Sequence, residues 1–205
     1  MDGTMTISAK EVKALRDRTG AGMMDCKRAL EETGGDMEAA IDYLRVRGAA
    51  KAAKRAEKTA NEGTIGSYTH FDGKTAVLVE VNCETDFVAN TDDFRQLAKD
   101  LAMHIASAAP TALSPEDIPS ELVDRERKVY EEQVREEGKP KELAGKIVEG
   151  KLQKWFKQST LLAQPFVKDP DKTIEELITE TSVKTGEKIE VARFARFRLG
   201  ETEPS

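Results

Sequence analysis

The sequence predicts an α+β protein: a helical N-terminal module, a linker, and a small antiparallel three-stranded sheet with packed helices and a helical hairpin. Three observations predict this class. Short helical segments broken by glycines fill the first part of the chain. The hydrophobic period then changes to that of strands. Later, two charged segments carry thin apolar seams, as in a coiled coil.

Helix-start signals mark the N-terminal module. Ser8 and Glu11 have capping-box spacing, in which each side chain meets the other residue's backbone amide. Gly20 is placed to end this helix in the left-handed conformation. A second helix is expected over residues 23–32, and Asp36 is expected to cap a third. Three short helices therefore form the module.

Alanine and lysine dominate residues 49–60, which have high helix propensity but little apolar surface to bury. We interpret this segment as a solvated helical linker. The expected division is a helical domain over residues 1–48, a linker over 49–62, and an α+β core over 63–205.

Strand signals open the core. Phe71-Asp72-Gly73-Lys74 resembles a type I′ hairpin turn, and residues 75–82 should form a buried strand. A core-facing helix follows, with apolar residues recurring from Phe94 to Ile105. A third strand is expected over 188–199. Its predicted apolar side holds Ile189, Val191, Ala195 and Phe197.

Two further helices, over residues 120–137 and 140–157, should form an antiparallel coiled-coil hairpin, taken as 121–158 within the core. The expected seam residues are Leu122, Val123, Val129, Tyr130, Leu143, Ile147, Val148, Leu152 and Trp155. Their outer faces are heavily charged, so the hairpin is expected to project into solvent.

Composition excludes several function classes. The 205-residue chain has a formal charge of −6, and its Lys and Arg residues are scattered, which disfavours direct nucleic-acid binding. No apolar run is long enough to span a membrane. The N-terminus lacks the apolar core of a secretory signal. We therefore expect a cytoplasmic protein.

Reactive constellations are missing as well. No phosphate-binding loop, dinucleotide fingerprint or nucleophile elbow occurs. Cys26 and Cys83 are far apart, and with only His70 and His104 beside them a zinc site is not expected. His104 is interpreted as structural, next to the apolar stripe of its helix. We expect no enzyme activity, no catalytic residue, no metal and no cofactor.

Motifs spread along the chain resemble those of the elongation factor Ts family. The most specific are the segments 19–27 and 81–89, which read TGAGMMDCK and VNCETDFVA. Further matches are Met103-His104-Ile105-Ala106, Gly138-Lys139-Pro140-Lys141 and Gln164-Pro165-Phe166-Val167. They occur in the family's order and span nearly the whole chain.

The resemblance implies that the N-terminal module is like a ubiquitin-associated domain. It also implies the short, single-core form of the family, in which one hairpin-plus-helix core replaces two related halves. Chains of that form are expected to associate through their sheets as a homodimer. Exposed edges of a three-stranded sheet would favour the same pairing.

The partner implied by the resemblance is elongation factor Tu, contacted at two places. Met23, Met24 and Lys27 would meet a helix of its nucleotide-binding domain, with Arg16 close by. The alternative is that both methionines belong to the core of the helical module. Adjacent helix positions point about 100° apart, however, so at least one should face outward.

The second contact implied by the resemblance is the segment of Asp86, Phe87, Val88 and Ala89. Its first two residues would reach beside the partner's magnesium region. The alternative is that Asp86 caps a helix and Phe87 is a core aromatic, the usual places of such residues.

The implied function is guanine-nucleotide exchange in translation: binding of elongation factor Tu·GDP and release of GDP by disturbing the magnesium and phosphate site. Two other classes stay open. The three-helix module alone would fit an adaptor that binds ubiquitin-like proteins, and a small enzyme is the second alternative.

Overall fold

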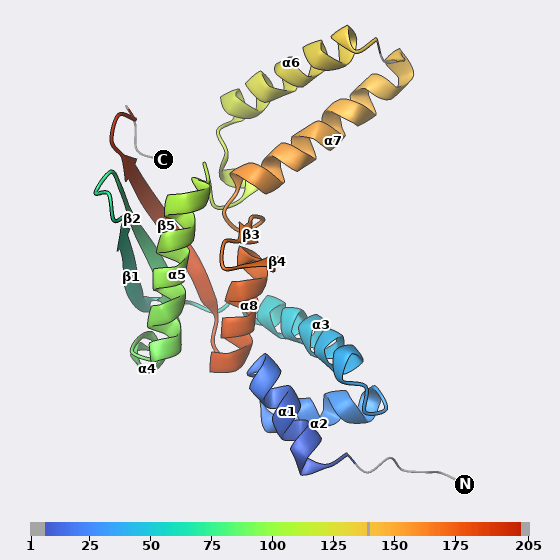
Figure 1. The fold of residues 1–205 in the computed structure, drawn as a ribbon, viewed down its shortest axis with the longest axis vertical. Helices are drawn as coiled ribbons and strands as arrows, with labels where there is room; N and C mark the ends of the chain where they lie inside the picture. The colour runs from blue at the N-terminus through green and yellow to red at the C-terminus, as the bar shows by residue number, and fades with distance from the viewer. Residues whose placement is uncertain (1–6, 139, 202–205) are drawn as a thin grey trace. The chain divides into compact units, whose positions relative to one another are not determined.

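The computed structural model describes residues 7–138 and 140–201, and Figure 1 shows their α+β architecture. The expected α+β class, with its small antiparallel three-stranded sheet, is confirmed. Lys139, which belongs to one of the motifs above, and residues 1–6, where no secretory signal was seen, lie outside the described residues. The described chain falls into two compact units.

The two units interleave in sequence. The first takes in the described part of Met1–Thr64 together with Val81–Leu97 and Glu176–Glu190. The second takes in Ile65–Glu80 and the described parts of Ala98–Glu175 and Val191–Ser205.

Helices α1 (Ala9–Thr19), α2 (Met23–Glu32) and α3 (Met37–Arg55) begin the first unit. The capping box at the start of α1 is present, Gly20 ends that helix with φ 67°, and the Asp36 side chain caps α3. Their shared core is built on Val12, Leu15, Ala21, Cys26, Ala29, Leu30 and Ala40.

Helix α3 is longer than expected, because it runs unbroken to Arg55 through the segment predicted as a separate linker. Gly48 is buried within it, and a Cβ there would lie 3.0 Å from a methyl carbon of Val183. Helix α8 (Ile174–Thr185) thus packs against α3 at Gly48, just before the predicted linker, whose residues 49–59 are mostly exposed, as a solvated helical segment should be.

Strands β1 (Glu62–Thr69), β2 (Thr75–Cys83) and β5 (Ile189–Arg198) form one sheet in the order β1-β2-β5. The central strand buries Val77, Val79, Val81 and Cys83 on one side, as expected for a covered face. A second, two-stranded sheet pairs β3 (Pro165–Phe166) with β4 (Asp169–Thr173).

The turn between β1 and β2 is not the expected type I′. That type needs positive φ at both central residues, but here Gly73 has φ 69° and Asp72 does not have a positive φ. The Gly73 amide donates to the His70 carbonyl at 2.8 Å, and the Asp72 side chain accepts from the Lys74 amide at 2.9 Å. A five-residue loop accommodates the strand twist with a single left-handed residue.

Strand β5 differs from the prediction at its far end. Phe197, expected on the apolar side, is 57% exposed, while Arg196 is buried and pairs with Glu201 at 2.8 Å. Arg193 bonds Glu80 of β2, which puts it on the face that also carries exposed Leu78. Because strand residues two apart share a face, Phe197 lies on that open face too.

Helix α5 (Asp92–Ala108) follows the short helix α4 (Asp86–Ala89) and confirms the predicted stripe. Its buried residues are Phe94, Leu97, Ala98, Leu101, Ala102, His104 and Ile105. His104 is structural, as expected: its Nε2 lies 3.0 Å from Gln164 Oε1, and its Nδ1 accepts from the Val167 amide at 3.3 Å. The histidine thus ties α5 to the segment that forms β3.

Helices α6 (Ser120–Glu136) and α7 (Lys141–Ser159) form the hairpin, preceded by the short 3₁₀ helix η1 (Pro115–Asp117). Its buried centre is Val134, Val148 and Leu152. Leu122, Val129 and Leu143 were expected in this seam but are exposed. Tyr130 of α6 and Ile147, Val148, Leu152 and Trp155 of α7 do lie in the seam, as predicted. The prediction missed Val134, which takes the central place on α6.

Within the described residues, no helix is both long and apolar enough to cross a membrane.

We predict that acid weakens the fold through His104. The Val167 amide donates to Nδ1, so the ring is neutral with its proton on Nε2. Burial lowers the pKa of His104. A depressed histidine pKa gives stability that is present above the ordinary value of about 6.5 and is lost as pH falls below it. Denaturant unfolding between pH 8 and 5 should show this loss.

The free energy of unfolding can fall by up to about 1.4 kcal/mol per pH unit for one such histidine. His104→Gln should flatten the profile below pH 6.5, while His70→Gln, the matched control, should keep the wild-type slope. Equal slopes in wild type and His104→Gln would contradict the prediction.

We also predict that α7 is stabilised by Gly145→Ala and by Gly150→Ala. A Cβ at either position would meet nothing within 4 Å. Alanine restricts the unfolded chain and favours a helix by about 0.5–1 kcal/mol over glycine. Thermal unfolding should shift upward for both. Gly138→Ala, at a left-handed turn with φ 64°, should shift it downward.

Candidate functional site

The loop between α1 and α2 is held rigidly by local hydrogen bonds. The Gly20 amide donates to the Arg16 carbonyl at 2.8 Å. The Thr19 hydroxyl donates to the Leu15 carbonyl at 2.8 Å and accepts from the Ala21 amide at 3.3 Å. Cys26 lies beneath, with its thiol 3.6 Å from the Ala21 carbonyl. The sequence TGAG therefore fixes where α2 begins.

Both predicted methionines are displayed at the start of α2. Met23 is 45% exposed and Met24 is 69% exposed, so neither belongs to the core of the module. Arg16 is exposed on α1, and Lys27 forms an exposed ion pair with Glu31 at 3.7 Å. A flexible, polarizable side chain beside cations is suited to contact with another protein.

The four residues of the second predicted segment are helix α4 itself. Thr85 is its N-cap, and the Thr85 hydroxyl accepts from the Val88 amide at 3.4 Å. The Asp86 carboxylate is thus not the cap that the sequence allowed as an alternative. Ala89 is buried and Val88 is half-buried, so they anchor the helix.

Phe87 is 83% exposed. The alternative that it is a core aromatic is therefore wrong. Asp86 is also exposed. A large apolar ring displayed beside a carboxylate, on a helix of one turn, has no role in packing the chain that carries it.

Glu187 fixes the base of α4, a role that sequence reasoning missed. One carboxylate oxygen accepts from the backbone amides of Glu84 and Thr85 at 3.1 and 3.0 Å, and the other accepts from the Thr85 hydroxyl at 2.6 Å. In return, Glu84 accepts from the Lys188 amide at 2.7 Å. The two segments are a hundred residues apart, so no local pattern could reveal the contact.

Lys58 completes this cluster, with its ammonium 2.8 Å from the Glu84 carboxylate. The pKa of Glu84 is lowered, first by the hydrogen bond from Lys58 and then by that from the Lys188 amide. Glu84 is therefore ionised at neutral pH and holds the start of β5 against the end of β2.

Both predicted segments belong to the first compact unit, and Lys184 of α8 lies between them. Its ammonium pairs with Asp93 at the start of α5 at 2.7 Å. Its methylene chain lies against Gly20, where an added Cβ would be 3.4 Å from Cδ. The unit thus links the loop before α2 to the helix that follows α4.

The site offers contact surface, and the described residues hold no cluster of His, Cys, Asp or Glu that could bind a metal ion. Cys26 and Cys83 are free and buried. The exposed groups of the two predicted segments are methionine, phenylalanine and isolated charges. These side chains can bind a protein surface, but they do not form a nucleophile-and-base pair.

Comparison with known proteins shows what the chain is related to. The pattern of the family described as Elongation factor TS matches residues 31–201. The chain belongs to the elongation factor Ts family. An Elongation factor Ts from Desulfosudis oleivorans is 55% identical over 196 residues, covering 96% of this chain and 99% of the relative.

Other relatives agree. Elongation factor Ts of Syntrophomonas wolfei is 55% identical over 195 residues, covering 95% of this chain and 91% of the relative. Elongation factor Ts of Geobacter sulfurreducens is 53% identical over 197 residues, covering 96% of this chain and 91% of the relative. As a member of the elongation factor Ts family, the chain is a translation elongation factor of protein biosynthesis, and the resemblance seen in its motifs is confirmed.

We predict that both thiols react slowly in the folded protein. Burial raises the pKa of Cys26, and it raises that of Cys83 with help from the nearby Glu187 carboxylate. A protonated, covered thiol is a poor nucleophile. An aromatic disulfide reagent at pH 8 should label neither residue quickly, and both should react at once in denaturant. Fast labelling of the native protein would show that the loop or the base of α4 opens.

Proposed function

We propose that this chain is the guanine-nucleotide exchange factor of elongation factor Tu, binding its GDP form and promoting GDP release by disturbing the magnesium and phosphate site. The observation that carries the proposal is Phe87, an exposed aromatic ring on a firmly held helix. Family membership supports it, since the resemblance implies this activity. The chain would then act in the cytoplasm, where protein synthesis takes place, without catalysing bond chemistry.

An exchange factor works by coupling. It binds the partner best in a state whose nucleotide site is distorted, so that factor and nucleotide weaken each other's binding by the same ratio. Such a factor needs a part that holds the partner and a part that favours the distorted state. The two segments of the first unit meet these needs.

The holding part is the ubiquitin-associated-like helical domain, proposed as residues 1–48. Arg16, Met23, Met24 and Lys27 would contact the nucleotide-binding domain of elongation factor Tu. The methionines supply adaptable apolar area, and the two cations supply complementarity to an acidic surface.

The disturbing part is α4. Fully burying a phenylalanine side chain is worth roughly 1.5–3 kcal/mol. If Phe87 becomes buried only in the distorted state of the partner, this energy biases the partner toward releasing nucleotide. Asp86 would place a negative charge beside the magnesium region, where it competes with the phosphates.

The other classes fit less well. An adaptor for ubiquitin-like proteins would need the helical module alone and leaves the sheet, α4 and the hairpin without a role. A small enzyme would need convergent reactive groups, and the exposed side chains of the two segments do not supply them. Binding to ubiquitin, or turnover of a small substrate, would favour these alternatives.

The direct test is GDP release. Purified elongation factor Tu loaded with a fluorescent GDP analogue is mixed with excess GDP, with and without this chain. Release should be much faster with the chain present. The chain alone, titrated with GDP and magnesium, should show no saturable binding. An unchanged release rate would contradict the proposal.

We predict that Phe87→Ala slows exchange by roughly tenfold or more, since a change of about 1.4 kcal/mol is a factor of ten. The ring is exposed, so the melting temperature of the free protein should stay nearly unchanged. Stopped-flow GDP release and thermal unfolding are measured on the same sample.

The matched control is Phe71→Ala, which removes a 93% exposed ring from the β1–β2 loop. It should leave exchange unaltered. A Phe87→Ala variant that melts far earlier yet exchanges at the normal rate would rule out the wedge, and so would equal losses in the two variants.

We also propose that two chains pair through their sheets. Within the described residues β1 and β5 are the edges of the sheet. One face of it is open and carries Leu78 and Phe197. Ile65 of β1 also lies on it, because Gly66 turns inward against the Ala98 backbone. Three exposed apolar side chains on one face are suited to cover by a second copy.

We predict that sedimentation at micromolar concentration gives a species of twice the 22.6 kDa chain mass. Phe197→Arg should convert it to a monomer, because two like charges would meet across the interface. The Phe71→Ala control should stay dimeric. A wild-type protein that sediments only as a monomer would contradict the pairing.

A further inference from the structure

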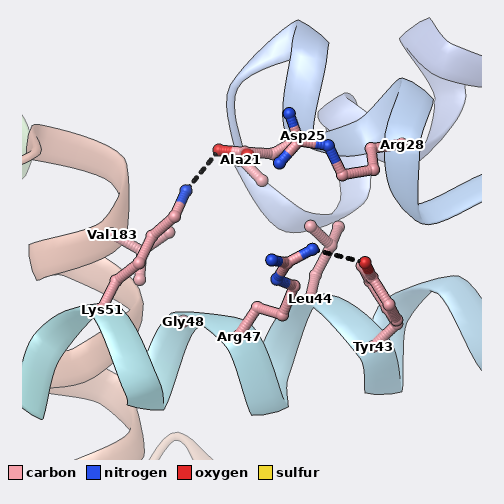
Figure 2. Close-up of a pocket in the computed structure, with 9 residues that line it drawn as sticks. All are labelled: Ala21, Asp25, Arg28, Tyr43, Leu44, Arg47, Gly48, Lys51 and Val183. Atoms are coloured by element: carbon pink, nitrogen blue, oxygen red, sulfur yellow. Dashed lines mark hydrogen bonds and ion pairs between the residues drawn. The ribbon is translucent and has the colours of Figure 1, made fainter.

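A small cleft in the first unit gathers three cations around a single carboxylate. Arg28 of α2 and Arg47 and Lys51 of α3 line it together with Asp25. Figure 2 shows Arg47 and Lys51 rising from α3 toward α2, with Arg28 on the α2 side beside Asp25. This charge excess stands out in a protein whose net charge is −6.

Only part of this positive charge is balanced. Lys51 pairs with Asp25 at 2.8 Å, which occupies the one carboxylate that lines the cleft. Among the described residues, neither Arg28 nor Arg47 has a carboxylate within ion-pair distance. Two guanidinium groups therefore border the same cleft without an anion.

Arg47 is also held in position. Its Nη1 donates to the Tyr43 hydroxyl at 2.6 Å, and its guanidinium carbon lies 5.4 Å from the centre of the Tyr43 ring (Figure 2). Stacking and the hydrogen bond fix the plane of the guanidinium. Less side-chain entropy is then lost when an anion binds.

The floor of the cleft is apolar, formed by Ala21, Leu44 and Val183 among others. Apolar walls exclude water and strengthen an ion pair formed inside. The cleft is small, so a glutamate or aspartate side chain would enter it with little more than its carboxylate, which would then lie against the guanidiniums. A nucleic-acid backbone would need a longer basic surface than three side chains supply.

The position of the cleft indicates which protein supplies the carboxylate. Arg28 is one helical turn after Met24, and residues four apart share a helix face. A partner segment that lies on Met24 therefore passes beside Arg28. We propose that the cleft takes an acidic side chain from the same partner segment that contacts Met24, so that the partner surface extends from α2 onto α3. This inference rests on the proposed binding of elongation factor Tu.

The test measures binding of fluorescently labelled elongation factor Tu·GDP at several salt concentrations. Arg28→Gln and Arg47→Gln should each weaken binding about five- to tenfold at low salt and flatten its salt dependence. Tyr43→Phe keeps the ring but removes the hydroxyl that orients Arg47. It should weaken binding about two- to threefold.

The matched control is Lys54→Gln, which removes the same charge from the same helix, two turns beyond Arg47 and outside the cleft. It should bind like wild type. If Lys54→Gln loses as much affinity as Arg47→Gln, the partner is held only by non-specific electrostatic attraction to the positive charge of α3, and the cleft is not a binding site. Circular dichroism and melting temperature should be unchanged in all four variants.

Other results of the same binding experiment separate a failure of the proposed function from a failure of the cleft proposal. If wild type does not bind elongation factor Tu, the proposed function fails, whereas wild-type binding with unaffected Arg28→Gln and Arg47→Gln variants overturns only the cleft. A short RNA that binds wild type and is lost in these two variants would show that the cleft takes phosphate instead. That result would overturn the acidic side chain as its occupant.

Discussion

One carboxylate holds the base of the candidate exchange segment. Glu187, just before β5, accepts three hydrogen bonds from Glu84 and Thr85, which follow β2. Hydrogen bonds to a charged group are stronger than neutral ones, and these three satisfy two backbone amides that would otherwise need water. Because Thr85 is also the N-cap of α4, the same contact orients the helix that displays Phe87.

A rigid base matters for the exposed residues, because it fixes their positions before a partner binds. A mobile Phe87 would lose conformational entropy on binding and would transmit little force to a partner. Held at its base by Glu187 and anchored by buried Ala89, the Phe87 ring has the fixed position that the proposed wedge requires. The methionines of α2 follow the same design, since the Thr19 and Gly20 hydrogen bonds fix the loop before them. In both places buried polar contacts next to the surface position an apolar group on it.

Local rules predicted much of the fold. The Ser8–Glu11 box, the Gly20 end of α1 and the stripe of α5 follow from periodicity and capping, which act over a few residues. The failures came where distant contacts decide. The pair with Glu201 buries Arg196, and the register of α6 puts Val134 in the hairpin centre. At the site, motif resemblance found Phe87, but Glu187 and Lys184 could not be found without the fold.

Amide hydrogen exchange in the free protein tests most directly whether Glu187 makes the base of α4 rigid. We expect strong protection of the Glu84 and Thr85 amides, and of the Ala89 amide that donates to the Thr85 carbonyl at 3.2 Å. In Glu187→Ala these amides should exchange at least about tenfold faster, while those of α7 stay unchanged. Rapid exchange at Glu84 and Thr85 in the wild-type protein would contradict it.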